Sequence, residues 1–168
     1  SLNIDPKQIE KNINDKTVAV VAVHCYGNPC DVDSLIAICN KYNLKLIFDG
    51  AQAFDSKLND KNIINYGDVS ILSFHATKVF TTFEGGAVIS KSYEQKRKID
   101  KLKNFGFNAE NDIDEIGLNF KMNEFSCILG LIQLKYIKKY LKKRKSIAEI
   151  YRTNLIKDIG ITLLEIKP

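Results

Sequence analysis

Polar side chains lie at or beside the ends of three apolar runs, and their types fit the binding of a phosphorylated aldehyde. Asp49 ends one run, Ser73 lies at the end of the next with Lys78 shortly after it, and Gly85-Gly86 precedes the third. A lysine amine forms an imine with an aldehyde. A buried carboxylate pairs with a pyridinium nitrogen, and a serine hydroxyl with backbone N–H groups holds phosphate. These residues therefore predict one ligand-binding rim.

Each of these residues also has an ordinary explanation when it is taken alone. Asp49 can cap a helix, Lys78 is one of many lysines with a solvated amine, and paired glycines are typical of a turn. His75 lies between Ser73 and Lys78, and a lone histidine more often forms a local hydrogen bond than acts as a catalyst. The residues alone support a ligand-binding α/β rim and no specific reaction.

The order of apolar runs and helix signals predicts the elements that position this rim. Strands are expected at residues 17–24, 44–49, 68–74 and 87–90. Helices are expected at residues 6–13, 32–42, 92–103 and 123–156, the last with or without a break, and residues 104–119 are expected to form a loop. The continuous valine-rich run 17–24 is typical of a strand buried on both faces.

The connections between these runs indicate an α/β sheet with helices on both faces. Strand, helix and strand over residues 17–49 favour a right-handed parallel crossover. Only residues 75–86 separate the third and fourth strands, which is too short for a helical crossover, so the fourth strand is expected to be antiparallel. Sheets of this class bind ligands beyond the carboxyl ends of their strands.

Composition limits the class of protein. With 168 residues, 45% hydrophobic and 27% charged, the chain suits one soluble domain with a sizeable core. No run approaches the ~20 apolar residues of a membrane span, and no leader marks secretion. None of the four cysteines forms a C-x-x-C pair, so we expect reduced thiols and a cytoplasmic protein.

Metal and nucleic-acid binding are both disfavoured. His24, Cys25 and Cys30 fit no common zinc spacing and lack a second ligand pair, so no metal is expected. The lysine-rich run 135–145 could bind nucleic acid, but it carries no reader motif and is expected to form a solvated helix face. Salt-dependent binding to DNA or RNA would support the nucleic-acid alternative.

Motifs over residues 17–151 give a more specific prediction than any of these residues alone. In chain order they are VAVHCYGNPCDVDSL, LIFDGAQAF, GDVSILSFHATKVFTTFEGGAVIS and GLNFKMNEFSCILGLIQL, with Arg144 and Tyr151 beyond. In order and spacing they resemble the DegT/DnrJ/EryC1/StrS family of nucleotide-sugar aminotransferases. The resemblance implies the fold of type I aminotransferases and the cofactor pyridoxal 5′-phosphate (PLP).

The resemblance also implies a role for each site residue. Asp49 would bind the pyridine nitrogen, Gln52 the ring or its hydroxyl, and Ser73 the phosphate. Lys78 would form the Schiff base. Asn119 would reach the phosphate of a neighbouring subunit's cofactor, which implies a homodimer with shared sites. Glutamate would be the amino donor and a keto-sugar linked to a nucleoside diphosphate the acceptor.

The resemblance further implies a division of the chain. Residues 1–156 would form the core of the PLP-binding large domain, truncated at its N-terminal side, and residues 157–168 would begin the connection to a mostly missing small domain. The family's upstream G-T segment and its ring-stacking aromatic are not in this chain. We therefore expect a fragment that is inactive alone and binds PLP weakly or not at all.

Departures from the family pattern and rival functions complete the prediction. Phe83 stands where the family commonly has Gly, Lys121 where Arg is usual, and Cys127-Ile128 where two Ala are common. Related sugar dehydratases replace the Schiff-base lysine with histidine, so lysine at position 78 argues against dehydration. A non-catalytic scaffold or dimerisation module that kept the motifs remains the alternative.

Overall fold

The structure is a computed structural model that describes residues 2–108, 110, 112–155 and 160–165. Its strands are β1 (Ala19–Val23), β2 (Lys45–Asp49), β3 (Lys57–Leu58), β4 (Lys61–Asn62), β5 (Val69–Ser73) and β6 (Gly86–Ser90). Its α-helices are α1 (Pro6–Asn12), α2 (Val32–Lys41), α3 (Tyr93–Leu102) and α4 (Glu124–Leu155), and η1 (Cys25–Gly27) and η2 (Ile63–Asn65) are 3-10 turns.

These elements confirm the main predictions, with ends shifted by one or two residues. Helix α4 is continuous as far as Leu155, without a break, and its expected end at residue 156 lies outside the described residues. The expected domain boundary at 156/157 lies there too. The β3–β4 hairpin was not predicted from the sequence.

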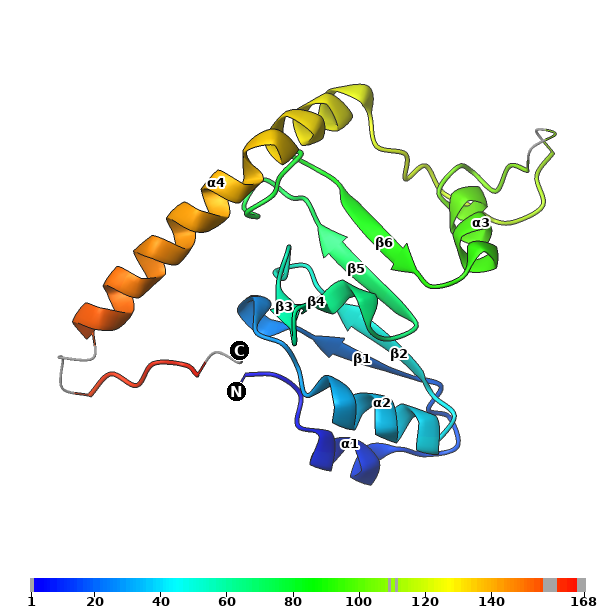
Figure 1. Cartoon of the computed structure of the whole chain (residues 1–168). Coiled ribbons are helices and arrows are strands. Elements are labelled where there is room, and N and C mark those ends of the chain that lie inside the picture. Colours follow the sequence, from blue (N-terminus) through cyan, green and yellow to red (C-terminus); the bar gives the residue numbers. More distant parts are fainter. Residues whose placement is uncertain (1, 109, 111, 156–159, 166–168) are drawn as a thin grey trace.

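Strands β1, β2, β5 and β6 form one sheet in that order, as Figure 1 shows. The first three strands are parallel and β6 is antiparallel to β5, which confirms the expected mostly parallel α/β class. The register places Val23 and Asp49, the last residues of β1 and β2, beside Ile71, two residues before the carboxyl end of β5 at Ser73. The polar residues of the predicted rim therefore meet at one edge of the sheet.

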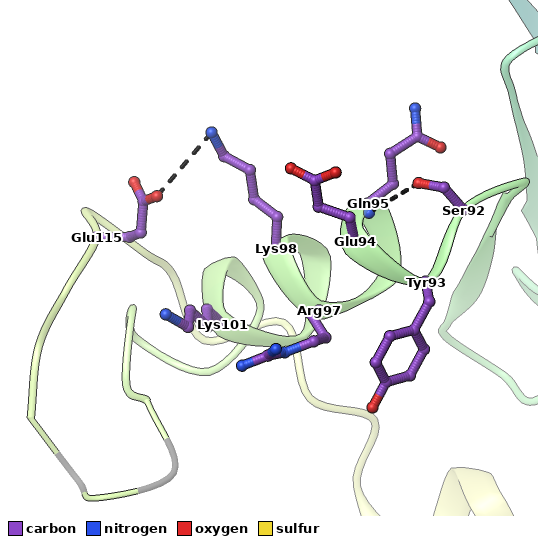
Figure 2. A pocket seen from close by; sticks show the side chains of 8 residues that line it. All are labelled: Ser92, Tyr93, Glu94, Gln95, Arg97, Lys98, Lys101 and Glu115. Atoms are coloured by element: carbon purple, nitrogen blue, oxygen red, sulfur yellow. Dashed lines mark hydrogen bonds and ion pairs between the residues drawn. The ribbon is translucent and has the colours of Figure 1, made fainter.

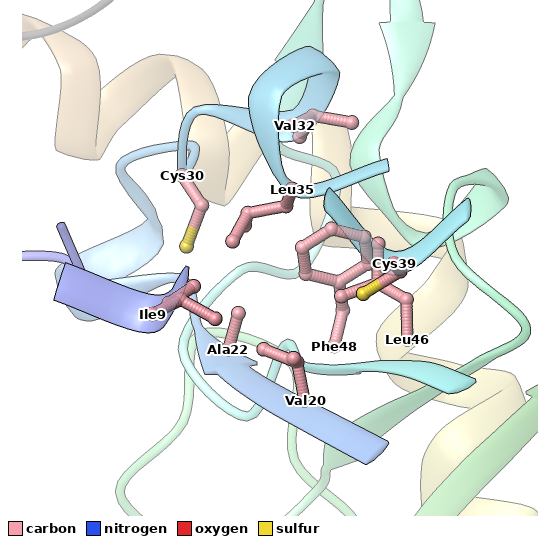
Figure 3. Packing of buried hydrophobic residues seen from close by; sticks show 9 residues of the cluster. All are labelled: Ile9, Val20, Ala22, Cys30, Val32, Leu35, Cys39, Leu46 and Phe48. Carbon is pink, nitrogen blue, oxygen red and sulfur yellow. The ribbon is translucent and has the colours of Figure 1, made fainter. Parts of the chain in front are cut away.

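The core lies between one face of the sheet and the helices α1 and α2 (Figure 3). Alternate strand residues point into it, and helix residues one turn apart cover them. Its cluster consists of Ile9, Val20, Ala22, Cys30, Val32, Leu35, Cys39, Leu46 and Phe48. Asp31 caps α2 by accepting from the backbone N–H of Ser34, and Asn43 ends the helix region with a φ of 51°.

The other face of β1 corrects one prediction. Val21 is 57% exposed and Val23 is 41% exposed, so the expectation that residues 17–24 are buried on both faces is wrong. In the part of the chain that the structure describes, no helix covers these two side chains. An apolar run shows that a strand can be buried on both faces, but the run does not supply the second covering layer.

Helix α4 packs against the loop between β5 and β6 through a glycine. A Cβ added at Gly130 would lie 3.0 Å from Cγ2 of Thr82, which is tighter than an ordinary contact. Ile137, seven residues further along, is buried at 8% exposure. Because residues seven apart lie on the same side of a helix, this face of α4 is the one that contacts the sheet domain.

The loop that follows β5 contains backbone conformations that explain its glycines. Gly85 has a φ of 148°, and a Cβ at Gly86 would lie 2.7 Å from the carbonyl oxygen of Leu72, so both positions favour glycine. Phe83 has a φ of 65° with its side chain largely exposed. The phenylalanine thus stands in a left-handed conformation, which accounts for the glycine that the family pattern has at this position.

Replacing Phe83 with glycine is expected to stabilise the fold. A left-handed backbone costs a residue with a Cβ roughly 1–2 kcal/mol, and glycine recovers most of this despite its greater freedom when unfolded. We expect F83G to raise the free energy of unfolding by about 1 kcal/mol, measured by urea denaturation. The control F83A keeps the Cβ and should change stability much less; equal effects of the two variants would contradict the explanation.

Candidate active site

A cavity of about 320 Å³ opens beyond the carboxyl ends of the parallel strands. Its lining comes from four separate parts of the chain: the turn after β1, the turn after β2, the loop after β5, and α4. The lining residues include Tyr26, Gln52, Phe54, Thr77, Lys78 and Arg144. Two of the sequence-predicted residues, Gln52 and Lys78, thus share one cavity.

Asp49 is the last residue of β2 and lies next to this cavity. Its Oδ1 accepts a hydrogen bond from the backbone N–H of Ala51 at 2.9 Å, and Ala51 itself lines the cavity. Its side chain shares the sheet face of Val23 and Ile71, opposite the core, because neighbouring positions in register point the same way. Among the described residues, Oδ2 of Asp49 has no hydrogen-bond partner, so this oxygen remains able to accept from a ligand.

Gln52 links the turns that follow β1 and β2. The backbone N–H of Tyr26 donates to Oε1 of Gln52 at 2.7 Å. Because a backbone N–H can only donate, this contact fixes which end of the amide is the oxygen. The NH₂ end of Gln52 is therefore the end left to donate to a ligand. Tyr26 itself has a φ of 54°, a rare conformation for a large side chain.

Ser73 and Lys78 lie at the end of β5 and in the loop after it. The backbone N–H of His75 donates to Oγ of Ser73 at 3.3 Å, which leaves the serine hydroxyl proton free to donate elsewhere. A turn bond from Lys78 N–H to the carbonyl of His75, 2.9 Å long, directs the chain back at Lys78. Across the described residues, the Lys78 amine pairs with no carboxylate.

Three aromatic rings hold the Lys78 loop in place. Phe74 and Phe80 flank the loop and meet edge to face with centroids 4.9 Å apart, and Phe54 stacks on Phe80 at 4.7 Å. Phe54 belongs to the turn after β2, so the cluster joins the loop of Lys78 to the turn of Gln52. Such ring pairs add about 0.5–1.5 kcal/mol each beyond the area that they bury.

His24 is a fully buried residue beneath this rim. Its Nδ1 accepts from the backbone N–H of Cys30 at 3.1 Å, and its ring stacks on Phe48 at 4.6 Å. Burial lowers the pKa of His24 to about 4, and the carboxylate of Asp49 offsets part of that decrease. The histidine is therefore neutral near pH 7, with its proton on Nε2. It orients the turn of residues 25–30 through this bond, and the thiol of Cys30 donates to the carbonyl of Val23.

Three of the predicted site residues do not line the cavity. Asp49 and Ser73 are the last residues of β2 and β5. Asn119 lies outside the strands. It pairs with Asn104 in the loop between α3 and α4 and is exposed. The cavity also contains residues that were not assigned a role from the sequence: Tyr26, Thr77 and Arg144. For Arg144 a signal existed, because it follows Gly130 and Ile137 at intervals of seven residues.

A larger cavity lies elsewhere, lined by side chains of α3 and by Glu115 (Figure 2). It measures about 530 Å³, and both of its lysines have partners: Lys98 lies 3.9 Å from Glu115, and Lys101 lies 2.5 Å from Asp114. It carries no cluster of groups suited to catalysis, so the smaller cavity beside Lys78 is the better candidate.

Among the described residues, no three His, Cys, Asp or Glu side chains gather as metal ligands would, and no helix is long and apolar enough to cross a membrane.

A family model decides what this arrangement is related to. The DegT/DnrJ/EryC1/StrS aminotransferase family matches residues 1–168. The chain belongs to that family. A dTDP-4-amino-4,6-dideoxy-D-glucose transaminase of Shigella dysenteriae is 48% identical over 158 residues, which cover 94% of this chain and 43% of the relative. The chain therefore spans less than half the length of this relative.

Solved structures of aminotransferases have the same fold. Helicobacter pylori PseC, an aminotransferase involved in the biosynthesis of pseudoaminic acid, has a TM-score of 0.92 at 34% identity, covering 98% of this chain and 47% of that one. The PLP-form of a putative sugar aminotransferase from Streptococcus pneumoniae has a TM-score of 0.87 at 25% identity, covering 94% and 46%. The fold predicted from the DegT/DnrJ/EryC1/StrS motifs is confirmed.

The polar atoms left open in this family member fit PLP chemically. PLP presents a protonated ring nitrogen, a ring hydroxyl oxygen, a phosphate and an aldehyde. The described side chains offer a free carboxylate oxygen on Asp49, an amide NH₂ on Gln52, a hydroxyl proton on Ser73 and an unpaired amine on Lys78. At the first three positions a hydrogen-bond donor meets an acceptor, and at the fourth the amine is the nucleophile that forms an imine with the aldehyde. The residues present are therefore compatible with the cofactor.

His24 makes folding stability depend on pH in this family member. Its pKa when folded, about 4, lies below the ordinary value of 6.5, so unfolding takes up a proton as the pH falls between these values. The contribution of His24 to the free energy of unfolding is fully present above pH 6.5. It decreases by about 3 kcal/mol as the pH falls toward 4. Urea denaturation measures this change. Between pH 6.5 and pH 4, we expect the free energy of unfolding to fall further in the wild type than in H24N, by about that amount. The variant keeps an acceptor for the backbone N–H of Cys30. Parallel pH profiles of the two proteins would contradict this assignment.

Proposed function

We propose that this protein is part of a PLP-dependent aminotransferase that moves an amino group from glutamate to a keto-sugar nucleotide. The observation that carries the proposal is that the amine of Lys78 and the amide of Gln52 line one cavity at the carboxyl ends of parallel strands. Membership of the aminotransferase family supports it, as does the similarity to a dTDP-sugar transaminase. The free cysteines are compatible with the cytoplasm as the proposed compartment.

In this proposal the four residues at the strand ends bind and orient the cofactor. Lys78 would hold the aldehyde covalently, and Asp49 would hold the proton on the ring nitrogen through Oδ2. Gln52 would donate its amide N–H to the ring hydroxyl oxygen, and Ser73 would donate to the phosphate. PLP, when bound, supplies an electron-withdrawing ring that stabilises negative charge at the neighbouring carbon. Asp49 strengthens that withdrawal, because its carboxylate keeps the ring nitrogen charged.

Lys78 also moves the proton. When it is not bound to the cofactor, its amine would act as the base that takes the proton from Cα of glutamate and as the acid that gives it back. The Phe54–Phe74–Phe80 cluster fixes the backbone from which this side chain extends. A rigid base on a short loop can serve two atoms that lie close together without moving its support.

The proposed partner is a second copy of this chain. Exposed apolar side chains are concentrated on the loop before α4 and on the first turn of α4, where Ile116, Phe120 and Phe125 are 97%, 72% and 87% exposed. Asn119 lies among them and outside its own chain's cavity. A two-fold dimer would cover these side chains and bring Asn119 to the phosphate in the partner's site.

Removing the amine of Lys78 is expected to abolish transamination. In the complete enzyme that carries this chain, we expect K78A to lose activity to below detection and to lose the borohydride-stable PLP label, located by peptide mass spectrometry. The matched control K91A removes an exposed lysine outside the cavity and should keep both. Labelling scattered over many lysines of the complete wild-type enzyme would favour the non-catalytic scaffold; the same test on the isolated chain shows whether this part alone forms the site.

Mixed dimers test the shared site. K78A and N119A homodimers should both have low activity, but a mixed dimer has one site with Lys78 from one subunit and Asn119 from the other. Unfolding and refolding an equal mixture should therefore restore about a quarter of the wild-type sites. Mixing K78A with D49N, whose lesions affect each subunit's own site, should restore nothing. Equal recovery in the two mixtures would show that Asn119 does not act across the dimer.

A further inference from the structure

Arg144 is a cation at the candidate active site that the cofactor leaves unused. It lines the same cavity as Lys78 and Gln52. Among the described residues, its guanidinium forms no hydrogen bond and no ion pair. Those residues also place no acidic side chain in the lining of the cavity. An arginine without a partner, facing a cavity without a carboxylate in its lining, is suited to bind an anion.

The packing of α4 brings this side chain to the cavity. Gly130 contacts the Lys78 loop at Thr82, and Ile137 is buried seven residues later. Arg144 follows after another seven residues, so it continues the packed face of the helix and extends past the end of the sheet. Neighbouring Lys142, Lys143 and Lys145 do not line the cavity, which places Arg144 apart from the rest of the basic run.

We propose that Arg144 binds the anionic group of the substrates, a deduction that rests on the proposed aminotransferase function. Both proposed substrates react with one end and carry negative charge at a distance from it: glutamate through its γ-carboxylate and the nucleotide sugar through its diphosphate. A guanidinium matches both anions, because its planar N–H groups form paired hydrogen bonds to carboxylate or phosphate oxygens. Lys78 acts at the reacting end of each substrate, and Arg144 positions the anionic end.

The residues around Arg144 support a substrate pocket and not a second cofactor contact. Tyr26 and Thr77 contribute hydroxyl-bearing side chains to the same cavity, and Phe54 contributes an apolar ring. Hydroxyls and a ring suit a sugar, whose hydroxyl groups and C–H faces need both kinds of contact. The left-handed backbone of Tyr26, held by Gln52, directs that residue from the β1 edge toward the cavity.

Calorimetric titration of the complete, PLP-loaded enzyme tests this role without relying on turnover. The probes are glutarate, an unreactive dicarboxylate, and the nucleoside diphosphates dTDP, UDP and GDP. We expect R144A to bind at least one probe class about 10- to 100-fold more weakly than wild type, and R144K to lose less. K143A, the matched control, should bind as wild type does. Weaker glutarate binding identifies the donor carboxylate as the ligand, and weaker nucleotide binding identifies the diphosphate.

Two results would overturn the proposal: R144A that binds both probe classes as tightly as wild type, or a wild-type enzyme that binds neither. Borohydride labelling of Lys78 separates this outcome from failure of the proposed function. R144A should keep the Lys78 label and raise KM for one substrate with a smaller change in kcat. If the wild-type enzyme itself is not labelled at Lys78, the aminotransferase proposal fails, whatever the titrations show.

Discussion

The in-register parallel pairing of β1, β2 and β5 is the constraint on which the candidate site depends. Val23, Asp49 and Ile71 are aligned by that pairing, so three successive turns leave the sheet at one edge. A shift of β2 by one residue would turn Asp49 into the core and Phe48 out of it. Burial of Phe48, which is 0% exposed, therefore holds the carboxylate of Asp49 on the opposite face. The hydrophobic core fixes the polar site without touching it.

The rim is preorganised because its polar residues use one atom for the fold and keep another for a ligand. Gln52 accepts from Tyr26, Asp49 accepts from Ala51, and Ser73 accepts from His75. Each bond orients a side chain that would otherwise rotate freely, so less entropy is lost when a ligand binds. His24 serves the same turn from below through a single neutral nitrogen. The fold thus supports the site with backbone N–H groups, which do not change charge with pH.

Sequence patterns predicted the features that depend on neighbouring residues and missed those that depend on distant ones. The runs that became β2 and β5 carried strand signals, and Asp31 and Ser92 marked helix starts that the structure has. The bare face of β1 was missed, because an apolar run does not report which layers exist to cover it. The β3–β4 hairpin was missed because two-residue strands have no periodicity. Arg144 could be placed at the cavity only once the packing of Gly130 was known.

The packing of helix α4 determines where Arg144 lies relative to the cavity. The helix is continuous from Glu124 to Leu155, and its tight contact at Gly130 lies 14 residues, or about 21 Å, before Arg144. The buried side chain of Ile137 supports the helix again seven residues, or about 10 Å, before Arg144. With two points of support, the helix resists tilting, so the backbone of Arg144 keeps its place beside the cavity and only its side chain is left to adjust to a ligand.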